Sequence, residues 1–223
     1  MTVMKEWTQE HGDRYRQHYD ALTFKDKQWI MDRILAKYLQ VVDDPVYLFA
    51  CLESLNRRNL NVLELGGYDG QQALKALEQY PEAGWTNCDI SKVAQYFTKP
   101  ELKDKNYTFI LLEKPFPSGL SLSGFDLFYT SKMLEHLRWR EAEELFDATK
   151  YIPLQVHVID YFWKDDTHVL EKESYSKVIP ALRNRGYRLV NKVGDESRLN
   201  LFMAHRAVKR KQGVGEAEKS VLV

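Results

Sequence analysis

The fold is decided by the stretch Leu60-Asn61-Val62-Leu63-Glu64-Leu65-Gly66-Gly67-Tyr68-Asp69-Gly70. An apolar run suited to a buried strand reaches an acid, turns on glycines and leads into a helix predicted to begin at Gln71 or Gln72. Glycine tolerates positive φ and lets a ligand approach the backbone closely. The helix N-terminus beyond the turn adds free N–H groups and positive potential. This order of elements predicts the ligand-binding crevice of a doubly wound α/β fold.

The spacing of the glycines narrows the choice of ligand. The dinucleotide pattern Gly-x-Gly-x-x-Gly fails, because counting from either Gly66 or Gly67 places another residue where the second glycine should be. The phosphate-loop pattern fails because no Lys follows Gly70. What remains is acid-x-Gly-x-x-x-Gly, which begins at Glu64. Taken alone, this pattern is also compatible with a tight strand-to-helix turn that binds nothing.

Two more acids stand at the ends of predicted strands. The strand predicted over 84–91 carries Asp89 near its end, and the strand over 107–112 is followed by Glu113. An acid about 20 residues beyond a glycine turn is placed to accept hydrogen bonds from two ribose hydroxyls, because a carboxylate accepts at both oxygens. Ser91 leaves a second interpretation open, in which this region caps a helix.

The rest of the chain continues the alternation of strands and helices. Further strands are predicted over 125–130, 155–162, 187–193 and 199–205, with helices over 139–149 and 175–184. Such alternation is typical of a mostly parallel sheet covered by helices.

These motifs together resemble the class I S-adenosylmethionine-dependent methyltransferases over about residues 61–206. Glu64 to Gly70 resembles motif I, Asp89-Ile90-Ser91 resembles motif II, and Leu134-Glu135-His136-Leu137 resembles the segment after motif IV in small-molecule members. Tyr68 departs from the family, which has a third glycine there. The resemblance implies a Rossmann-like, doubly wound, mostly parallel seven-stranded sheet with an antiparallel edge hairpin and N-terminal helices. It also implies S-adenosylmethionine as the cofactor.

The same resemblance implies a set of site residues. Segment 129–136 is expected to border the transferred methyl group, and Glu113 to lie near the adenine amino group. The residues expected to bind the cofactor are Glu64, Gly66, Gly67, Tyr68, Gly70, Asp89, Ile90, Glu113, Lys114 and Ser131.

Methyl transfer requires few functional side chains from the protein. Transfer from a sulfonium releases a neutral sulfide, so the protein has to align the reactants and, for a hydroxyl acceptor, remove a proton. We expect His136 to be this base, with His157, His168 and Tyr129 as alternatives, because His titrates in the right range. A packing or capping role for His136 is the other interpretation.

Metal-dependent and nucleic-acid-modifying members of the family fit the sequence poorly. Glu135-His136 resembles the metal site of a group of small-RNA 2′-O-methyltransferases, but Lys132 stands where that group has a Glu. A cation is a poor neighbour for a metal ion, so we expect no metal. Segment 129–132 also lacks the prolines of base methylases, and the 32 basic residues balance 32 acidic ones, which argues against nucleic acid as a partner.

Aromatic residues suggest where an acceptor binds. Tyr15 and Tyr19 lie in an N-terminal region of helical pattern, and aromatic rings attract a sulfonium cation through their faces. Tyr161 and Trp163 could add further apolar walls. We therefore expect O-methylation of a small or medium organic molecule, with these four residues binding the substrate. Packing or surface exposure is the alternative for Tyr15 and Tyr19.

The chain of 223 residues is divided by pattern into an N-terminal helical cap (1–59), a methyltransferase domain (60–207) and a flexible tail (208–223). No apolar run approaches the roughly 20 residues of a membrane span, and the first residues lack the layout of a signal peptide. With only Cys51 and Cys88 as cysteines, we expect a cytoplasmic protein without disulfides. The oligomeric state stays open.

The sequence leaves two other functions open. The fold could serve as a catalytically inactive binding or scaffold module, an alternative that Tyr68 in the glycine turn suggests. A NAD(P)-dependent oxidoreductase would share the fold, but the glycine fingerprint is missing.

Overall fold

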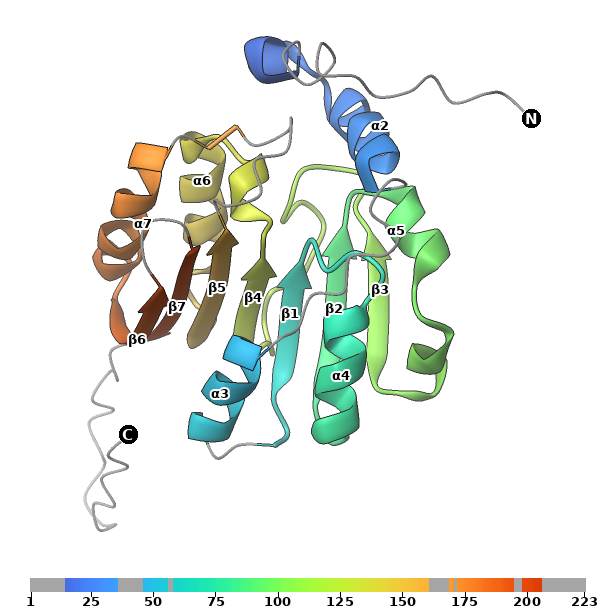
Figure 1. Ribbon diagram of the computed structural model, residues 1–223, viewed down its shortest axis with the longest axis vertical. Coiled ribbons are helices and arrows are strands. Elements are labelled where there is room, and N and C mark those ends of the chain that lie inside the picture. The colour runs from blue at the N-terminus through green and yellow to red at the C-terminus, as the bar shows by residue number, and fades with distance from the viewer. Residues whose placement is uncertain are drawn as a thin grey trace.

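The computed structural model describes residues 15–35, 46–55, 58–160, 169–170, 172–194 and 198–205. Seven strands form one sheet in the order β3-β2-β1-β4-β5-β7-β6 (Figure 1). The strands are β1 (Asn61–Leu65), β2 (Gly84–Asp89), β3 (Tyr107–Leu111), β4 (Leu127–Ser131), β5 (Leu154–Asp160), β6 (Tyr187–Gly194) and β7 (Arg198–His205).

The pairing of the strands confirms the predicted sheet. Strand β1 pairs in parallel with β2 on one side and with β4 on the other, and β3 and β5 extend the parallel part. Strand β7 runs antiparallel to both β5 and β6, which makes the expected edge hairpin. The chain winds outward from β1 to β3 and then returns to β4, so the strand order reverses between β1 and β4, where such sheets bind ligands.

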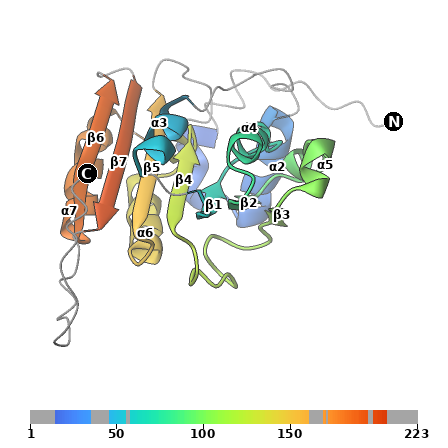
Figure 2. The same cartoon turned by 90° about the horizontal axis from the view of Figure 1, so that it is seen from below.

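Helices cover both faces of the sheet (Figure 2). Helices α3 (Val46–Leu55) and α4 (Gln71–Gln79) lie on one face, and α6 (Trp139–Thr149) and α7 (Lys172–Asn184) lie on the other. The remaining helical elements are α2 (Phe24–Leu35), α5 (Lys92–Phe97) and the 3₁₀ turns η1 (Tyr19–Ala21), η2 (Pro100–Asp104) and η3 (Leu134–His136).

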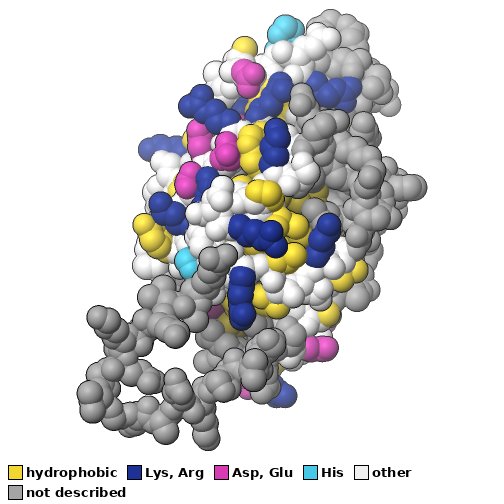
Figure 3. All heavy atoms as spheres, turned by 90° about the vertical axis from the view of Figure 1, so that its left-hand side faces the viewer, with side chains coloured by type: hydrophobic (Ala, Val, Ile, Leu, Met, Phe, Trp, Pro, Cys, Tyr) yellow, Lys and Arg dark blue, Asp and Glu magenta, His cyan; other side chains and the backbone are white. Residues whose placement is uncertain are grey.

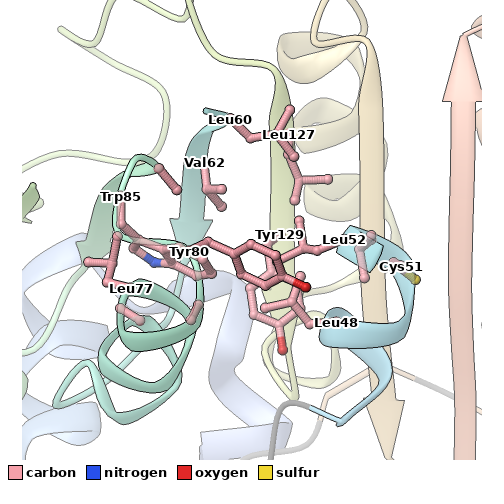
Figure 4. Packing of buried hydrophobic residues seen from close by; sticks show 14 of the residues in the cluster. Leu48, Cys51, Leu52, Leu60, Val62, Leu77, Tyr80, Trp85, Leu127 and Tyr129 are labelled. Atoms are coloured by element: carbon pink, nitrogen blue, oxygen red, sulfur yellow. The ribbon is translucent and has the colours of Figure 1, made fainter. Parts of the chain in front are cut away.

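A separate apolar cluster fills each layer. On the side of α3 and α4, the helices cover a cluster that includes Leu48, Leu77, Trp85 and Tyr129 (Figure 4). The rings of Trp85 and Tyr129 pack edge to face, with their centroids 6.2 Å apart. On the other side, α6 and α7 bury side chains such as Phe146 against the sheet. Strands buried on both faces account for the continuous apolar character of the parallel segments.

Helix α2 lies across the carboxyl ends of the parallel strands rather than on either face (Figure 1). Two of its polar side chains attach it there. Gln28 donates to the carbonyl oxygen of Ile90 at 2.7 Å, and Asp32 accepts from the Ser91 hydroxyl at 2.7 Å. The N-terminal region therefore covers the end of the sheet where the crevice was predicted.

Strand β6 forms one edge of the sheet, and its outward side chains are mixed. Arg188 and Lys192 are exposed, as are the apolar Val190 and Val193, and Figure 3 shows basic side chains spread among apolar ones on this side. A register shift between Leu189 and Asn191 interrupts the pairing with β7. Bulges and lysines are common devices that protect a sheet edge from unwanted pairing.

Candidate functional site

A cavity of about 370 Å³ lies at the carboxyl ends of the central strands, beneath α2. Four of the five parallel strands contribute to it at or just beyond their ends: Leu65 and Gly66 at β1, Asp89 and Ile90 at β2, Leu112 after β3, and Met133 after β4. Its size is within the range of small-molecule sites, and its position is that of the ligand crevice in doubly wound folds.

Gly66 and Tyr68 of the glycine turn line the cavity. Gly66 has φ +76°, and a Cβ atom there would lie 2.6 Å from Cγ of Met133. Gly70 has φ +78° and is the N-cap residue of α4, so the helix begins at Gln71 as predicted, but Gly70, also predicted to bind the cofactor, lies outside the cavity lining. Tyr68 also takes a positive φ, +48°, and lines the cavity. The tyrosine therefore adopts the left-handed conformation for which glycine is the usual residue.

A buried polar layer supports this turn from below. Glu64 is buried, and its Oε2 accepts from the Trp85 indole N–H at 2.7 Å. Asn87 pairs with Glu64 across the strands and accepts from the Gly67 N–H at 3.0 Å. A Cβ atom on Gly67 would overlap the Glu64 carboxylate. Glu64 and Gly67 thus shape the turn from beneath and lie outside the cavity lining.

Asp89 is the buried acid of the cavity wall. Its Oδ1 accepts from the Ser91 N–H at 2.8 Å, and its Oδ2 accepts from the Tyr68 N–H at 3.2 Å. Burial raises the pKa of Asp89 to about 6, against the lowering effect of these backbone donors. Ser91 caps α5 through its hydroxyl, so the capping interpretation holds for Ser91 while Asp89 faces the cavity.

The wall beyond β2 and β3 is apolar. Ile90 and Leu112 line the cavity, and Gln28 of α2 lies against their backbone, 2.7 Å from the Ile90 carbonyl oxygen and 3.5 Å from that of Leu112. Glu113 and Lys114, both predicted to bind the cofactor, are exposed and lie outside the lining. Leu112 and Pro115, on either side of them, line the cavity instead.

Tyr15 and Tyr19 are buried and close the cavity from the N-terminal side. Their rings meet edge to face at 5.3 Å. The Tyr19 hydroxyl donates to Oε2 of Glu141 at 2.6 Å and lies 3.1 Å from the carbonyl oxygen of His136. The Lys27 ammonium sits 3.7 Å from the centre of the Tyr19 ring and pairs with Oε1 of Glu141 at 2.9 Å. The hydroxyl of Tyr19 is thus engaged, and Tyr19 offers the cavity its ring.

The histidines lie in very different surroundings. His136 ends η3, is partly buried and lines the cavity. His157 lies in the core, where its ring nitrogens are 2.8 Å from the Thr130 hydroxyl and 3.0 Å from Oε1 of Gln155. Burial lowers the pKa of His157 to about 3, so this ring is neutral at physiological pH. Of these two candidate bases, His136 alone is at the cavity.

The remaining predicted residues are placed as follows. Tyr129 is buried in the core, where its hydroxyl donates to Oε1 of Gln72. Ser131 ends β4 and is partly buried, outside the cavity lining. Tyr161, Trp163 and His168 lie outside the described residues.

Comparison with solved structures identifies the fold. The TehB-like SAM-dependent methyltransferase from Corynebacterium glutamicum is 12% identical, with a TM-score of 0.57 over 89% of this chain and 100% of that one. Magnesium protoporphyrin IX methyltransferase from Synechocystis, solved with bound SAM, is 14% identical, with a TM-score of 0.56 over 92% and 100%. The glycopeptide N-methyltransferase MtfA is 9% identical, with a TM-score of 0.55 over 75% and 92%. This chain has the class I methyltransferase fold. In sequence, no family model and no curated protein matches it.

Within this methyltransferase fold, the sequence did not identify several side chains at the site. Lys27 and Glu141 close the cavity together with Tyr19, although each looks like an ordinary charge of an amphipathic helix. Asn87 was detectable in principle, because it precedes Asp89 by two residues and side chains alternate along a strand. Among the described residues there is no group of three or more His, Cys, Asp or Glu that could hold a metal ion, and no helix suited to span a membrane.

Proposed function

We propose that this protein binds S-adenosylmethionine in the cavity and transfers its methyl group to a small or medium organic acceptor, through oxygen. The observation that carries the proposal is that one cavity joins both sets of residues. Gly66 and Asp89, which we expect to bind the cofactor, line the same cavity as Tyr19 and His136, which we expect to serve the acceptor.

The residues on the cofactor side of the cavity suit the chemistry of S-adenosylmethionine. The close packing at Gly66 brings the backbone to the cavity lining, where a larger residue would be strained. The Asp89 carboxylate accepts from the Tyr68 and Ser91 N–H groups and, as a two-oxygen acceptor, would also suit ribose hydroxyls. Ile90 and Leu112 offer apolar surface for an adenine ring. Bound there, S-adenosylmethionine would supply an electrophilic methyl group on a sulfonium.

The residues on the acceptor side would align a nucleophile and receive its proton. Tyr15, Tyr19 and Leu137 give this part of the cavity an aromatic and apolar wall. A hydroxyl acceptor must lose its proton as the new C–O bond forms, and His136, which lines the cavity, would take it. We assign substrate binding to Tyr15 and Tyr19, and the role of general base to His136.

The structural neighbours support the cofactor more than the acceptor. One of them was solved with bound SAM, which favours the same molecule here. Their named acceptors range from a magnesium porphyrin to a glycopeptide, so the shared fold gives no preference among acceptors.

Calorimetry with S-adenosylmethionine, S-adenosylhomocysteine and NAD tests the cofactor. We expect micromolar binding of the first two and none of NAD. A transfer screen against phenols, sugars, amines and peptides, with RNA as control, then tests the acceptor. A protein that binds neither adenosyl compound refutes the proposal, and transfer to RNA alone refutes the small-molecule acceptor.

A catalytically inactive binding module remains the second candidate, and Tyr68 favours it. Its side chain lines the cavity at a position where the family resembled has glycine, and it takes up space on the cofactor side. Binding of S-adenosylhomocysteine without transfer to any acceptor class would support this function instead.

A further inference from the structure

Tyr68 is unusual in its backbone conformation. Its φ of +48° places a residue with a bulky side chain in the left-handed region, which is disfavoured for residues that carry a Cβ atom. Such conformations persist where the surrounding structure holds them in place, and they concentrate at functional sites. Something in this chain must therefore hold the turn.

The side chain of Asn87 is placed to hold it. Asn87 is completely buried in β2, and both ends of its amide contact the turn. Its Oδ1 accepts from the Gly67 N–H at 3.0 Å, and its Nδ2 donates to the Tyr68 carbonyl oxygen at 3.2 Å. The same Nδ2 lies 3.3 Å from the Tyr107 hydroxyl of β3, which fixes the amide from its other side. The contacts on either side of Tyr68 thus fix its φ and ψ.

This conformation lets Tyr68 connect two parts of the site. Its N–H points to Oδ2 of Asp89, at 3.2 Å, while its hydroxyl lies 3.3 Å from the carbonyl oxygen of Leu35. Leu35 belongs to α2. Tyr68 therefore joins the acid of the cavity wall to the helix that covers the cavity.

We propose that Asn87 is a positioning residue, which holds Tyr68 in its left-handed conformation and so keeps the turn, Asp89 and α2 in register for cofactor binding. This role rests on the proposed function, because it concerns the same cavity. Nothing in the sequence resemblance assigns a role to Asn87. A purely structural Asn in the core would stabilise the fold without regard to which residue occupies position 68.

A double-mutant cycle separates these two roles. Asn87→Ala is made in the natural chain and in Tyr68→Gly, because glycine adopts the left-handed conformation without support. Thr86→Ala, the adjacent residue on β2, is the matched control for damage to the strand. The measurement is the dissociation constant for S-adenosylhomocysteine, accompanied by the melting temperature of each variant.

We expect Asn87→Ala to weaken binding roughly tenfold in the natural chain, the scale of one to two neutral hydrogen bonds, and less than about threefold in the Tyr68→Gly background. Thr86→Ala should bind as the natural chain does. An equal loss in both backgrounds, or no loss in either, overturns the positioning role.

A second measurement works without the cofactor. Hydrogen exchange at the amides of Gly67 and Tyr68 should accelerate in Asn87→Ala and stay unchanged in Thr86→Ala. If the natural chain binds no S-adenosylhomocysteine, the proposed function fails, while accelerated exchange would still support the positioning role of Asn87. Unchanged exchange at both amides would overturn the inference even if the protein binds the cofactor.

Discussion

Lowering the pH from about 7.5 to about 5 should weaken the binding of S-adenosylhomocysteine, because Asp89 takes up a proton in this range. The carboxylate is buried in the cavity wall, and burial raises its pKa to about 6 from an ordinary value of 3.8. Two ribose hydroxyls would donate to the ionised form, so the cofactor binds that form preferentially. Binding therefore competes with protonation, and the affinity falls as the pH falls through the raised pKa.

The size of the effect follows from the pKa. If only the ionised form binds, the apparent dissociation constant grows by the factor 1 + 10^(pKa − pH), which is about 11 at pH 5 and about 1.1 at pH 7. With the ordinary pKa of 3.8, the same factor at pH 5 would be about 1.06. A change of roughly tenfold is thus expected where an exposed aspartate would give almost none.

Calorimetric titrations at constant ionic strength, in steps of about half a pH unit, measure this dependence. Asp89→Asn keeps the shape of the side chain but cannot ionise, so this variant should bind more weakly and with a flat profile. His136→Gln, which removes a different titratable group from the cavity lining, should retain the dependence of the natural chain. Affinity that is constant down to pH 5, or a dependence that persists in Asp89→Asn, would refute the assignment of Asp89.

Three further predictions concern the turn, the core and the reaction. Gly67→Ala should lower the free energy of unfolding in urea by about 2–4 kcal/mol, because the added methyl group displaces the buried Glu64. The double variant Gly67→Ala/Glu64→Ala should recover part of this loss, and simple additivity of the two single losses would contradict the geometry. The pKa of His157, about 3 in the folded protein, lies below the ordinary 6.5, so the unfolded chain binds a proton first as the pH falls. Stability should therefore drop by about 2 kcal/mol from this group between pH 7 and pH 5, and His157→Gln should lack that drop. His136→Gln should lower turnover roughly 10²–10⁴-fold with unchanged cofactor affinity, and full turnover would remove His136 from the role of base.

The sheet could be predicted from the sequence because its signals are local. Apolar runs mark β1 and β5 directly, and the glycine turn fixes the start of α4 at Gln71. Helix α6 begins and ends where its pattern predicts, at Trp139 and Thr149. The antiparallel pairing of β6 with β7 followed from the resemblance and is confirmed. Short elements such as α5 and η2 were not predicted, because helices of fewer than two turns have too few residues to show a period.

The candidate site was harder to predict from the sequence than the sheet, because its residues meet only through tertiary packing. Asp89 was found from its place at a strand end, and it lines the cavity. Glu113 is also at a strand end, yet the backbone beyond β3 exposes it and turns Leu112 inward. Lys27 and Glu141 are separated by 114 residues and pair only because α2 lies across the sheet. No spacing rule connects positions that far apart.

The backbone itself gives an argument for the cavity that is independent of any relative. In the described part of the chain, two residues other than glycine have positive φ: Tyr68 at +48° and Lys132 at +51°. Both line the cavity, although they follow different strands. Each conformation costs on the order of 1–2 kcal/mol, and a chain selected for stability alone would place glycine at such positions. Backbone strain at two positions of one cavity therefore indicates that these side chains are kept for their role in the cavity. For Tyr68, the contacts to Asp89 and to Leu35 of α2 supply a reason.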